Sequence, residues 1–287
     1  MTKIDVHATQ LIDTATEARD AVLSAQRAGD SIGFVPTMGA LHAGHLSLVE
    51  ASLAAHDRTV VSIFVNPTQF GSGEDLEHYP RPINQDVRML EVCGCWMVFA
   101  PLFEEMYGEN CQTTVEVGHV AEPLEGVARP QHFRGVATVV LKLLQIVPAD
   151  CIFFGQKDYQ QTLVVRQLVR DLDVPTDIQI CPTVREPSGL AISSRNAYLS
   201  AAERTQAAIL WQALLRAEKM RSEGASDVSA IEAEMRRILK SAGVHVEYIA
   251  FLEDGTVREV STIDGPTVVA LAARVGQTRL IDNHNLG

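Results

Sequence analysis

Two histidines three residues apart are the first residues of this chain that could carry out chemistry. They are His42 and His45, in the stretch PTMGALHAGH at 36–45. Such a pair could bind a metal ion, pack in a core, or face the phosphates of a nucleotide. A metal site would need a third ligand, and the zinc motif H-E-x-x-H has a glutamate and a wider spacing. Here only Ala43 and Gly44 separate the histidines, which favours phosphate, while a core pair stays open.

The elements that must position these histidines belong to a series in which strands and helices alternate. Apolar, β-branched runs predict strands at 31–35, 59–65, 96–100, 151–155 and 177–184. A capping box, Thr14 with Glu17, predicts a helix over 14–29. Apolar residues at helical spacing predict helices at 42–55, 136–147 and 160–172, and a further helix is expected around 84–93. This alternation is typical of βαβ units and a twisted parallel sheet, and Pro36 is expected to end the first strand.

In an open parallel sheet, ligands bind beyond the carboxyl ends of the strands. The histidines follow the first predicted strand at that edge, on one face of a helix that begins near them. The free N–H groups and the dipole of a helix N-terminus attract anions. Lys157 is a second cation at the same edge, directly after the 151–155 strand and beside Asp158. This placement favours a phosphate role over that of a surface lysine.

The pattern changes after about residue 185. Two helical stretches, 201–222 and 227–241, follow each other and precede strands at 244–252, 268–275 and 278–283. Helices grouped before strands indicate a small α+β domain. The sequence therefore predicts an α/β fold, a Rossmann-like doubly wound parallel sheet over 1–185 with a smaller C-terminal α+β domain over 186–287.

Composition excludes several classes of function. The 287 residues carry a formal net charge of -12 and contain no block of lysine or arginine, so binding to nucleic acid or to an anionic membrane is not expected. The start, MTKIDVHATQLID, lacks the apolar segment of a signal peptide, and the apolar run 135–147 is too short to span a bilayer. Five cysteines form no disulfide framework. These features predict a cytoplasmic protein with reduced cysteines.

Longer motifs narrow the function. H-x-G-H after P-T-M-G-x-L resembles the signature of the nucleotidylyl-transferase superfamily. The set PTMGALHAGH, VSIFVNPTQF, YPR, HFRGV, GQKDYQQ and ISSRN resembles the pantoate–β-alanine ligase family, from about residue 30 to the C-terminal RLIDN. The resemblance implies that (R)-pantoate and ATP form pantoyl adenylate, from which β-alanine displaces AMP to give pantothenate. It also implies that the histidines face ATP.

The resemblance also implies the site residues. His42, His45 and Lys157 would be catalytic, with His45 at the position of the proton donor, and Gln69 and Gln161 would bind pantoate, with Gln69 shared by β-alanine. Val184 would contact adenine through its backbone. The residues implied to bind ATP are Met38, Gly39, Ala40, Leu41, His42, Ala43, Gly44, His45, Gly155, Gln156, Lys157, Asp158, Val184, Ile192, Ser193, Ser194 and Arg195.

The implied organisation is an ATP- and pantoate-binding domain over 1–185, a lid domain over 186–287, and a homodimer. Mg²⁺ is expected with the triphosphate, bound through phosphate oxygens and not at a dedicated protein metal site. The chain departs from the family at Gln156, where the motif is G-E-K-D, and at Gln85, which precedes Asp86 where an acidic pair is usual. The roles of Arg129, His132 and Arg134 stay open.

Two other functions are compatible with the same motifs. A simple adenylyl- or cytidylyltransferase would leave the nucleotide on its product, and a nucleotide-sensing module would bind ATP without turnover. The length and acidic charge disfavour an aminoacyl-tRNA synthetase. The products distinguish these classes, since AMP together with a new amide identifies a ligase.

Overall fold

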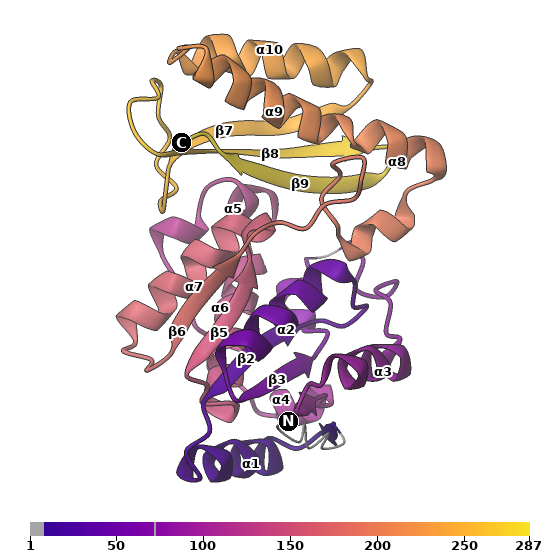
Figure 1. Ribbon diagram of the computed structural model, residues 1–287, viewed down its shortest axis with the longest axis vertical. Coiled ribbons are helices and arrows are strands. Elements are labelled where there is room, and N and C mark those ends of the chain that lie inside the picture. Colours follow the sequence, from indigo (N-terminus) through magenta and orange to yellow (C-terminus); the bar gives the residue numbers. More distant parts are fainter. Residues whose placement is uncertain (1–8, 72) are drawn as a thin grey trace, which may run out of the picture. The chain divides into compact units, whose positions relative to one another are not determined.

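The computed structural model describes residues 9–71 and 73–287, which form two compact units (Figure 1). The first unit contains the described chain up to Gly155 together with Val164–Cys181. The second contains Gln156–Leu163 and Pro182–Gly287. The predicted functional division at residue 185, with its lid role for the second part, stays a prediction.

The first unit is built on a six-stranded sheet in which every pairing is parallel. The strands lie in the order β1-β4-β3-β2-β5-β6. Their bounds are β1 Gln10–Ile12, β2 Ile32–Thr37, β3 Arg58–Ile63, β4 Met97–Phe99, β5 Cys151–Gly155 and β6 Asp177–Cys181. The five predicted strands and their parallel arrangement are confirmed, whereas the short edge strand β1 was not predicted.

Helices cover both faces of this sheet, because neighbouring strand residues point to opposite sides. Phe34 packs in a core with α1 and α6, and the next residue, Val35, packs in a second core with α2 and α3. The helices are α1 Ala15–Arg27, α2 Ala43–Ala55, α3 Ile83–Cys93, α4 Phe103–Met106, α5 Glu125–Ala128 and α6 His132–Ile146. α7 (Tyr159–Asp171) begins in the second unit and continues in the first. The doubly wound prediction is confirmed.

The strand order locates the edge at which a ligand is expected. The chain builds β2, β3 and β4 outward on one side, then returns to place β5 and β6 on the other side of β2. Such a reversal is a topological switch point, and ligands bind there beyond the carboxyl ends of the strands. The segments that follow β2 and β5 are therefore the first places to look for a site.

The prediction that Pro36 ends the first strand is wrong. β2 continues through Thr37, with Pro36 aligned with Ser62 of β3. On its other side β2 pairs with β5 only at Gly33 and Phe34. Pro36 lies beyond the residues of β2 that pair with β5. Its missing N–H therefore leaves no gap in the pairing of β2 with β5.

The second unit contains an antiparallel sheet of β7 (His245–Glu253), β8 (Thr267–Val275) and β9 (Thr278–Asn285). The helices α8 (Ala201–Ala207), α9 (Ile209–Ser222) and α10 (Val228–Ser241) precede it, and α9 and α10 pack along one face (Figure 1). The predicted α+β fold is confirmed. The helix predicted at 201–222 is divided into α8 and α9 at Ala208.

Two predictions about the chain's surroundings are tested by the structure only in part. Of the helices in the described residues, none is long and apolar enough to cross a bilayer. The absence of a signal peptide was predicted from residues 1–13, of which 1–8 lie outside the described residues. All five cysteines are described, and each has a free thiol.

Candidate active site

The loop after β2 is held in an uncommon backbone conformation. Gly39 and Ala40 both have positive φ angles, 80° and 50°, and the second is unfavourable for a residue with a Cβ. The Asp86 carboxylate on α3 stabilises this turn, because one oxygen accepts from the N–H of Ala40 at 2.8 Å and the other from the N–H of Leu41 at 2.9 Å. Asp86 is 1% exposed; burial raises its pKa, and the two backbone hydrogen bonds oppose that rise.

The prediction that both histidines lie on one helix face needs a correction: only His45 lies within the helix, although the two rings are side by side. His42 precedes α2 as its N-cap, with an extended backbone, and its Nδ1 accepts from the N–H of Gly44 at 3.1 Å. His45 lies in the first turn, and the two rings stack with centroids 4.0 Å apart. Because Nδ1 of His42 is an acceptor, its neutral ring carries the proton on Nε2. The stacked pair thus lies at the N-terminus of a thirteen-residue helix, where anions are favoured.

Gln69 lies beside this loop, at the end of the 3-10 turn η1 (Pro67–Gln69) that follows β3. Its Oε1 accepts from Nδ2 of Asn66 at 3.1 Å, and its Nε2 donates to Sδ of Met38 at 3.2 Å. Gln69 is 8% exposed, so its amide is held in one orientation. The first unit therefore brings Met38, implied to bind ATP, together with Gln69, implied to bind pantoate.

The turn at Gln69 packs closely on the first turns of α6. A Cβ at Gly135 would lie 2.4 Å from the carbonyl oxygen of Thr68, so only glycine fits there. That approach lets Nδ2 of Asn66 also donate to the Gly135 carbonyl, at 3.2 Å. The glycine of the HFRGV motif thus fixes the place of the Gln69 turn.

Arg129 and His132 hold the backbone of Gln69. The carbonyl of Gln69 can only accept, so the 2.9 Å contact with Nδ1 of His132 requires a proton on Nδ1. Nε2 of His132 then accepts from Nη1 of Arg129 at 3.2 Å, which makes the ring neutral. Burial and the charge of Arg129 accordingly lower the pKa of His132 to about 4.

Glu74 completes this group by pairing with Arg129, whose Nε lies 2.9 Å from a Glu74 oxygen. Burial alone would raise the pKa of Glu74, but the hydrogen bond and charge of Arg129 outweigh it and lower the pKa. These contacts give Arg129 and His132 a positioning role that the sequence left open. Arg134 is exposed on the first turn of α6.

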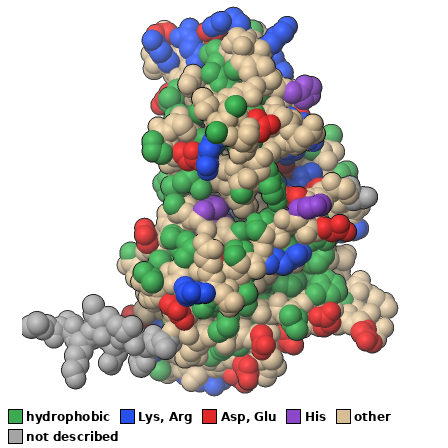
Figure 2. All heavy atoms as spheres, turned by 90° about the vertical axis from the view of Figure 1, so that its right-hand side faces the viewer, with side chains coloured by type: hydrophobic (Ala, Val, Ile, Leu, Met, Phe, Trp, Pro, Cys, Tyr) green, Lys and Arg blue, Asp and Glu red, His purple; other side chains and the backbone are tan. Residues whose placement is uncertain are grey.

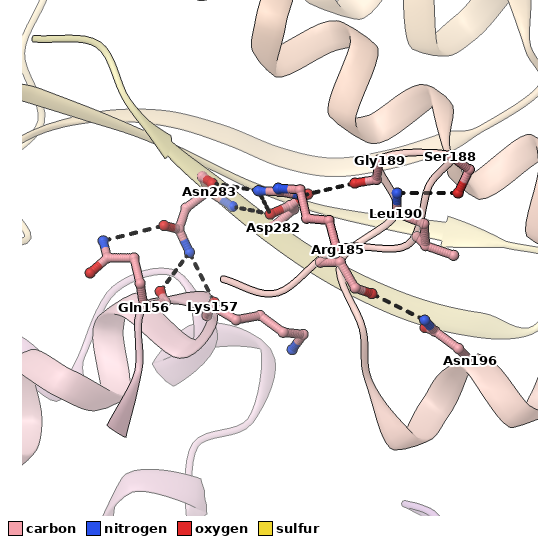
Figure 3. A network of polar contacts seen from close by, with 10 residues as sticks. Gln156, Lys157, Arg185, Ser188, Gly189, Leu190, Asn196, Asp282 and Asn283 are labelled. Carbon is pink, nitrogen blue, oxygen red and sulfur yellow. Dashed lines mark hydrogen bonds and ion pairs between the residues drawn. The ribbon is translucent and has the colours of Figure 1, made fainter. Parts of the chain in front are cut away.

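In the second unit, the GQKD motif forms the 3-10 turn η3 (Gln156–Asp158) directly after Gly155, the last residue of β5. Nζ of Lys157 lies 3.4 Å from Oδ1 of Asp158, a long contact that leaves the ammonium only weakly engaged by that carboxylate. Gln161 is half-buried in the first turn of α7. Figure 3 shows the side chain of Lys157 extending away from the β9 residues that contact its backbone.

The segment that contains Val184 and the ISSRN motif is fixed at one end. Arg185 pairs with Asp282 through two hydrogen bonds of 2.6 and 2.9 Å and lies 3.6 Å above the ring of Trp211 (Figure 3 shows the Asp282 pair). Gly189, with a φ of 90°, packs so closely on Trp211 that a Cβ would collide with it. This end of the segment is therefore anchored.

The other end of the segment forms the short turn η4 (Ser194–Tyr198). Its N-cap is Ser193, whose Oγ accepts from the N–H of Arg195 at 3.3 Å. The N–H of Ile192 donates to the carbonyl of Val184 at 2.9 Å. The second unit thus joins Val184 to Ile192 and Ser193 to Arg195, all implied to bind ATP, within one local structure.

Several cationic side chains on α9 and α10 of the second unit are paired with carboxylates. Figure 2 shows lysine and arginine side chains gathered over the end of the second unit where α9 and α10 lie. Among them, Arg236 pairs with Glu232 at 2.7 Å, while Arg216 and Arg237 pair with Glu234. These carboxylates partly compensate the positive charge of the surface formed by α9 and α10.

The His, Cys, Asp and Glu side chains of the described residues do not gather into a metal site. Within residues 9–71 and 73–287 there is no group of three or more His, Cys, Asp and Glu side chains that could hold a metal ion. Asp86 does not fit a Mg²⁺ ligand as it lies, because both of its oxygens accept backbone N–H groups in a buried place.

The sequence did not reveal Asn66 and Asn283 as residues that hold the site, and it pointed to Asp86 only as part of an incomplete acidic pair. Asp86, Asn66 and Asn283 are buried polar residues that bond to the predicted site segments. A signal existed for Asn66 in VNPTQF and for Asn283 in RLIDN, since both stand within quoted motifs. Asn66 also bonds to Gly135, which is 69 residues away, and Asn283 bonds to Gln156, which is 127 residues away. Motifs do not reveal such pairs.

Comparison with known proteins supplies the remaining findings. The family model described as pantoate-beta-alanine ligase matches residues 10–285. The pantothenate synthetase of Herpetosiphon aurantiacus is 48% identical over 276 residues, which cover 96% of this chain and 99% of that protein. The pantothenate synthetase of Agrobacterium fabrum is 47% identical over 280 residues, covering 97% of this chain and 96% of that protein.

Solved structures agree with these relatives. A pantothenate synthetase from Thermus thermophilus superposes with a TM-score of 0.93 at 41% identity, covering 97% of this chain and 99% of that one. A pantoate-beta-alanine ligase from Francisella tularensis, described as complexed with beta-gamma ATP and beta-alanine, gives a TM-score of 0.82 at 37% identity. That match covers 96% of this chain and 97% of the other.

Proposed function

Because this chain belongs to the pantoate–β-alanine ligase family and is an ATP-binding ligase of pantothenate biosynthesis, we propose that it works through pantoyl adenylate. The pantoate carboxylate attacks the α-phosphorus of ATP, and the bond to the β-phosphate breaks to release pyrophosphate. The amine of β-alanine then attacks the acyl carbon, loses a proton, and displaces AMP. The observation that carries the proposal is the match of the family model over residues 10–285.

The first step places charge on phosphate oxygens and on the departing pyrophosphate, so fixed donors can lower its barrier. We assign this role to His42 and His45 at the N-terminus of α2 and to Lys157 after β5. The strand order supports the assignment, since β2 and β5 are neighbours at the switch point. Ser193, Ser194 and Arg195 would add hydroxyl groups and a guanidinium to the triphosphate site. The lid role of 186–287 belongs to this proposal.

We assign pantoate to Gln69 and Gln161, and β-alanine to Gln69. The amide nitrogen of Gln69 uses one hydrogen for Met38, and the second can donate to a substrate oxygen. Neither glutamine can take a proton from an amine at neutral pH. The adenylate removes the need for such a base, because AMP is a good leaving group whose phosphate can accept the proton.

Three further features stay proposals. Mg²⁺ accompanies the triphosphate through phosphate oxygens. The chain acts as a homodimer, as its resemblance to the family implies. Its place in the cell is the cytoplasm, an assignment that rests on its free cysteines.

The direct test is incubation with ATP, pantoate, β-alanine and Mg²⁺, followed by mass analysis. We expect pantothenate, AMP and pyrophosphate in equal amounts. A second reaction without β-alanine, with labelled pyrophosphate, should exchange label into ATP when pantoate is present. Exchange that begins only after β-alanine is added would contradict a free adenylate, and a product that retains AMP would identify a nucleotidyltransferase instead.

A further inference from the structure

Two adjacent buried residues of β9 contact two of the predicted ATP segments. Asp282 and Asn283 are each 4% exposed, although both side chains are polar. Asp282 pairs with Arg185, which begins the segment that leads to the ISSRN motif. Asn283 contacts the GQKD turn, more than a hundred residues earlier in the chain (Figure 3). Buried polar side chains almost always have hydrogen-bond partners, so the partners of these two residues indicate what the residues hold in place.

The amide of Asn283 is fully committed to that turn. Its Nδ2 donates to the carbonyl oxygens of Gln156 and Lys157, at 2.9 Å each, which uses both hydrogens. Its Oδ1 faces Nε2 of Gln156 at 3.4 Å. A glutamate at 156, as in the family motif, would place an acceptor against this oxygen. The glutamine of this chain therefore suits the orientation of Asn283.

The backbone of Asn283 is also fixed. Asn283 is paired with Ala270 in the β8–β9 ladder, its N–H donates to Oδ1 of Asp282, and its carbonyl accepts from Arg185 at 3.3 Å. Because the backbone of Asn283 is fixed, its side-chain amide can fix the two carbonyl oxygens that it contacts. The carbonyl oxygens of Gln156 and Lys157 belong to the two peptide planes on either side of the Lys157 Cα, so fixing both oxygens fixes the direction in which the Lys157 side chain leaves the backbone.

We propose that Asn283 is a positioning residue for Lys157: it fixes the η3 turn so that the ammonium is aimed before ATP binds. The proposal rests on the proposed phosphate role of Lys157. Asn283 contacts the turn through the carbonyl oxygens of Gln156 and Lys157 and through the side chain of Gln156, so it acts on the Lys157 ammonium through the backbone and not by touching it. Misplacement of a catalytic group by about 1 Å can cost roughly 100-fold in rate, so loss of the two hydrogen bonds should be visible in the adenylation step.

The first experiment measures pantoate-dependent exchange of pyrophosphate into ATP for three variants. Asn283→Ala removes both donors, and Asn283→Asp keeps the size of the side chain but places an acceptor against two carbonyl oxygens. Each should lower the exchange rate by about 10- to 100-fold, by analogy with the loss of residues that orient catalytic ligands. Asn285→Ala is the control, because Asn285 is exposed on the same strand and bonds to Gly287. It should leave the rate unchanged.

A double-mutant cycle separates positioning from general destabilisation. If Asn283 acts through Lys157, Asn283→Ala should cost less than about threefold in a Lys157→Ala background. An equal loss in both backgrounds, or a near-normal rate in either folded Asn283 variant, would overturn the proposal. If Lys157→Ala alone exchanges normally, the role assigned to Lys157 fails, and that result is visible without any Asn283 variant. Circular dichroism and thermal unfolding establish that each variant is folded.

Discussion

The turn after β2 and the turn after β5 are held by opposite chemistry. The first presents two backbone N–H groups to the buried carboxylate of Asp86. The second presents two backbone carbonyl oxygens to the buried amide of Asn283. In each case one short side chain, distant in sequence, satisfies two successive peptide groups of a segment with a predicted phosphate-binding residue.

This difference teaches how a loop can be rigid without regular secondary structure. A turn whose N–H groups face inward needs an acceptor, and a turn whose carbonyl groups face inward needs a donor. Asp and Asn have nearly the same shape and supply opposite hydrogen-bonding groups. Exchanging one for the other should therefore damage both turns, each for the reverse reason.

The largest loss of activity is expected when the predicted phosphate-binding residue near each turn, His45 or Lys157, is replaced. His45→Ala and Lys157→Ala each remove a preorganised donor to phosphate, which typically costs about 10²–10³ in kcat. Pyrophosphate exchange and overall turnover should fall together, while circular dichroism stays unchanged. His78→Ala and Lys219→Ala are matched controls on exposed side chains and should be fully active. A folded His45 or Lys157 variant with near-normal turnover would show that its assigned role is wrong.

A smaller effect is expected when Asp86 is replaced by Asn. The new amide can accept only through one oxygen, so one of the N–H groups of Ala40 and Leu41 faces another donor in a buried place. That change should cost about 1–3 kcal/mol of stability, and we expect at least a tenfold loss of kcat. Urea unfolding and steady-state kinetics measure the two. Glu91→Gln, an exposed position on the same helix, is the control.

The same variant decides whether Asp86 serves a metal ion. If it only holds the turn, the Mg²⁺ concentration for half-maximal activity should be unchanged in Asp86→Asn. A large rise in that concentration, together with normal stability, would assign Asp86 to the metal and break the comparison between the two turns.

These interactions also show what the sequence could and could not predict. The spacing of apolar residues over 42–55 predicted α2, because helical periodicity is a local signal. The capping box at Thr14 predicted the start of α1, because a cap bonds within its own turn. The residues expected at the site came from a resemblance in short motifs, and their roles stay predictions.

What the sequence could not predict depends on contacts between distant segments. Asp86 and Ala40 are 46 residues apart, and Asn283 and Lys157 are 126 residues apart. No local pattern specifies such pairs. The predicted helix included His42, because histidine is an unusual N-cap. In the structure His42 precedes the helix, and its ring nitrogen caps it. β1, with three residues, is too short for its alternation to stand out.

A third prediction concerns the pH dependence of stability. The carbonyl of Gln69 accepts a hydrogen bond from the neutral ring of His132. The pKa of His132 is about 4 in the folded protein and about 6.5 in the unfolded chain. Between these values the unfolded chain binds more protons, so the free energy of unfolding should fall as pH decreases from 6.5 towards 4. The slope is at most about 1.4 kcal/mol per pH unit, and no contribution is expected above roughly pH 6.5.

Urea unfolding at about pH 7.5, 6 and 5 measures this effect against His132→Gln, which cannot titrate. The difference in unfolding free energy between the original chain and the variant should shrink as the pH falls. A difference that is constant with pH would mean that His132 titrates alike in both states, and the assigned neutral Nδ1–H form would then be wrong.

The smallest effect should be seen in the segment that joins Arg185 to Asn196. A lid that closes on ATP predicts slower hydrogen exchange across this segment when ATP binds. The anchors at Asp282 and Trp211 already fix its first part, and the N–H groups of Glu186 and Gly189 have backbone partners without nucleotide. The change should therefore be confined to Ser193–Arg195, where hydroxyl groups and a guanidinium can meet the triphosphate. Exchange measured by mass spectrometry at saturating ATP tests this, with Lys157→Ala as a variant that should bind ATP less well. Equal protection throughout the segment with and without ATP would identify it as a static connection, held as firmly as the two turns.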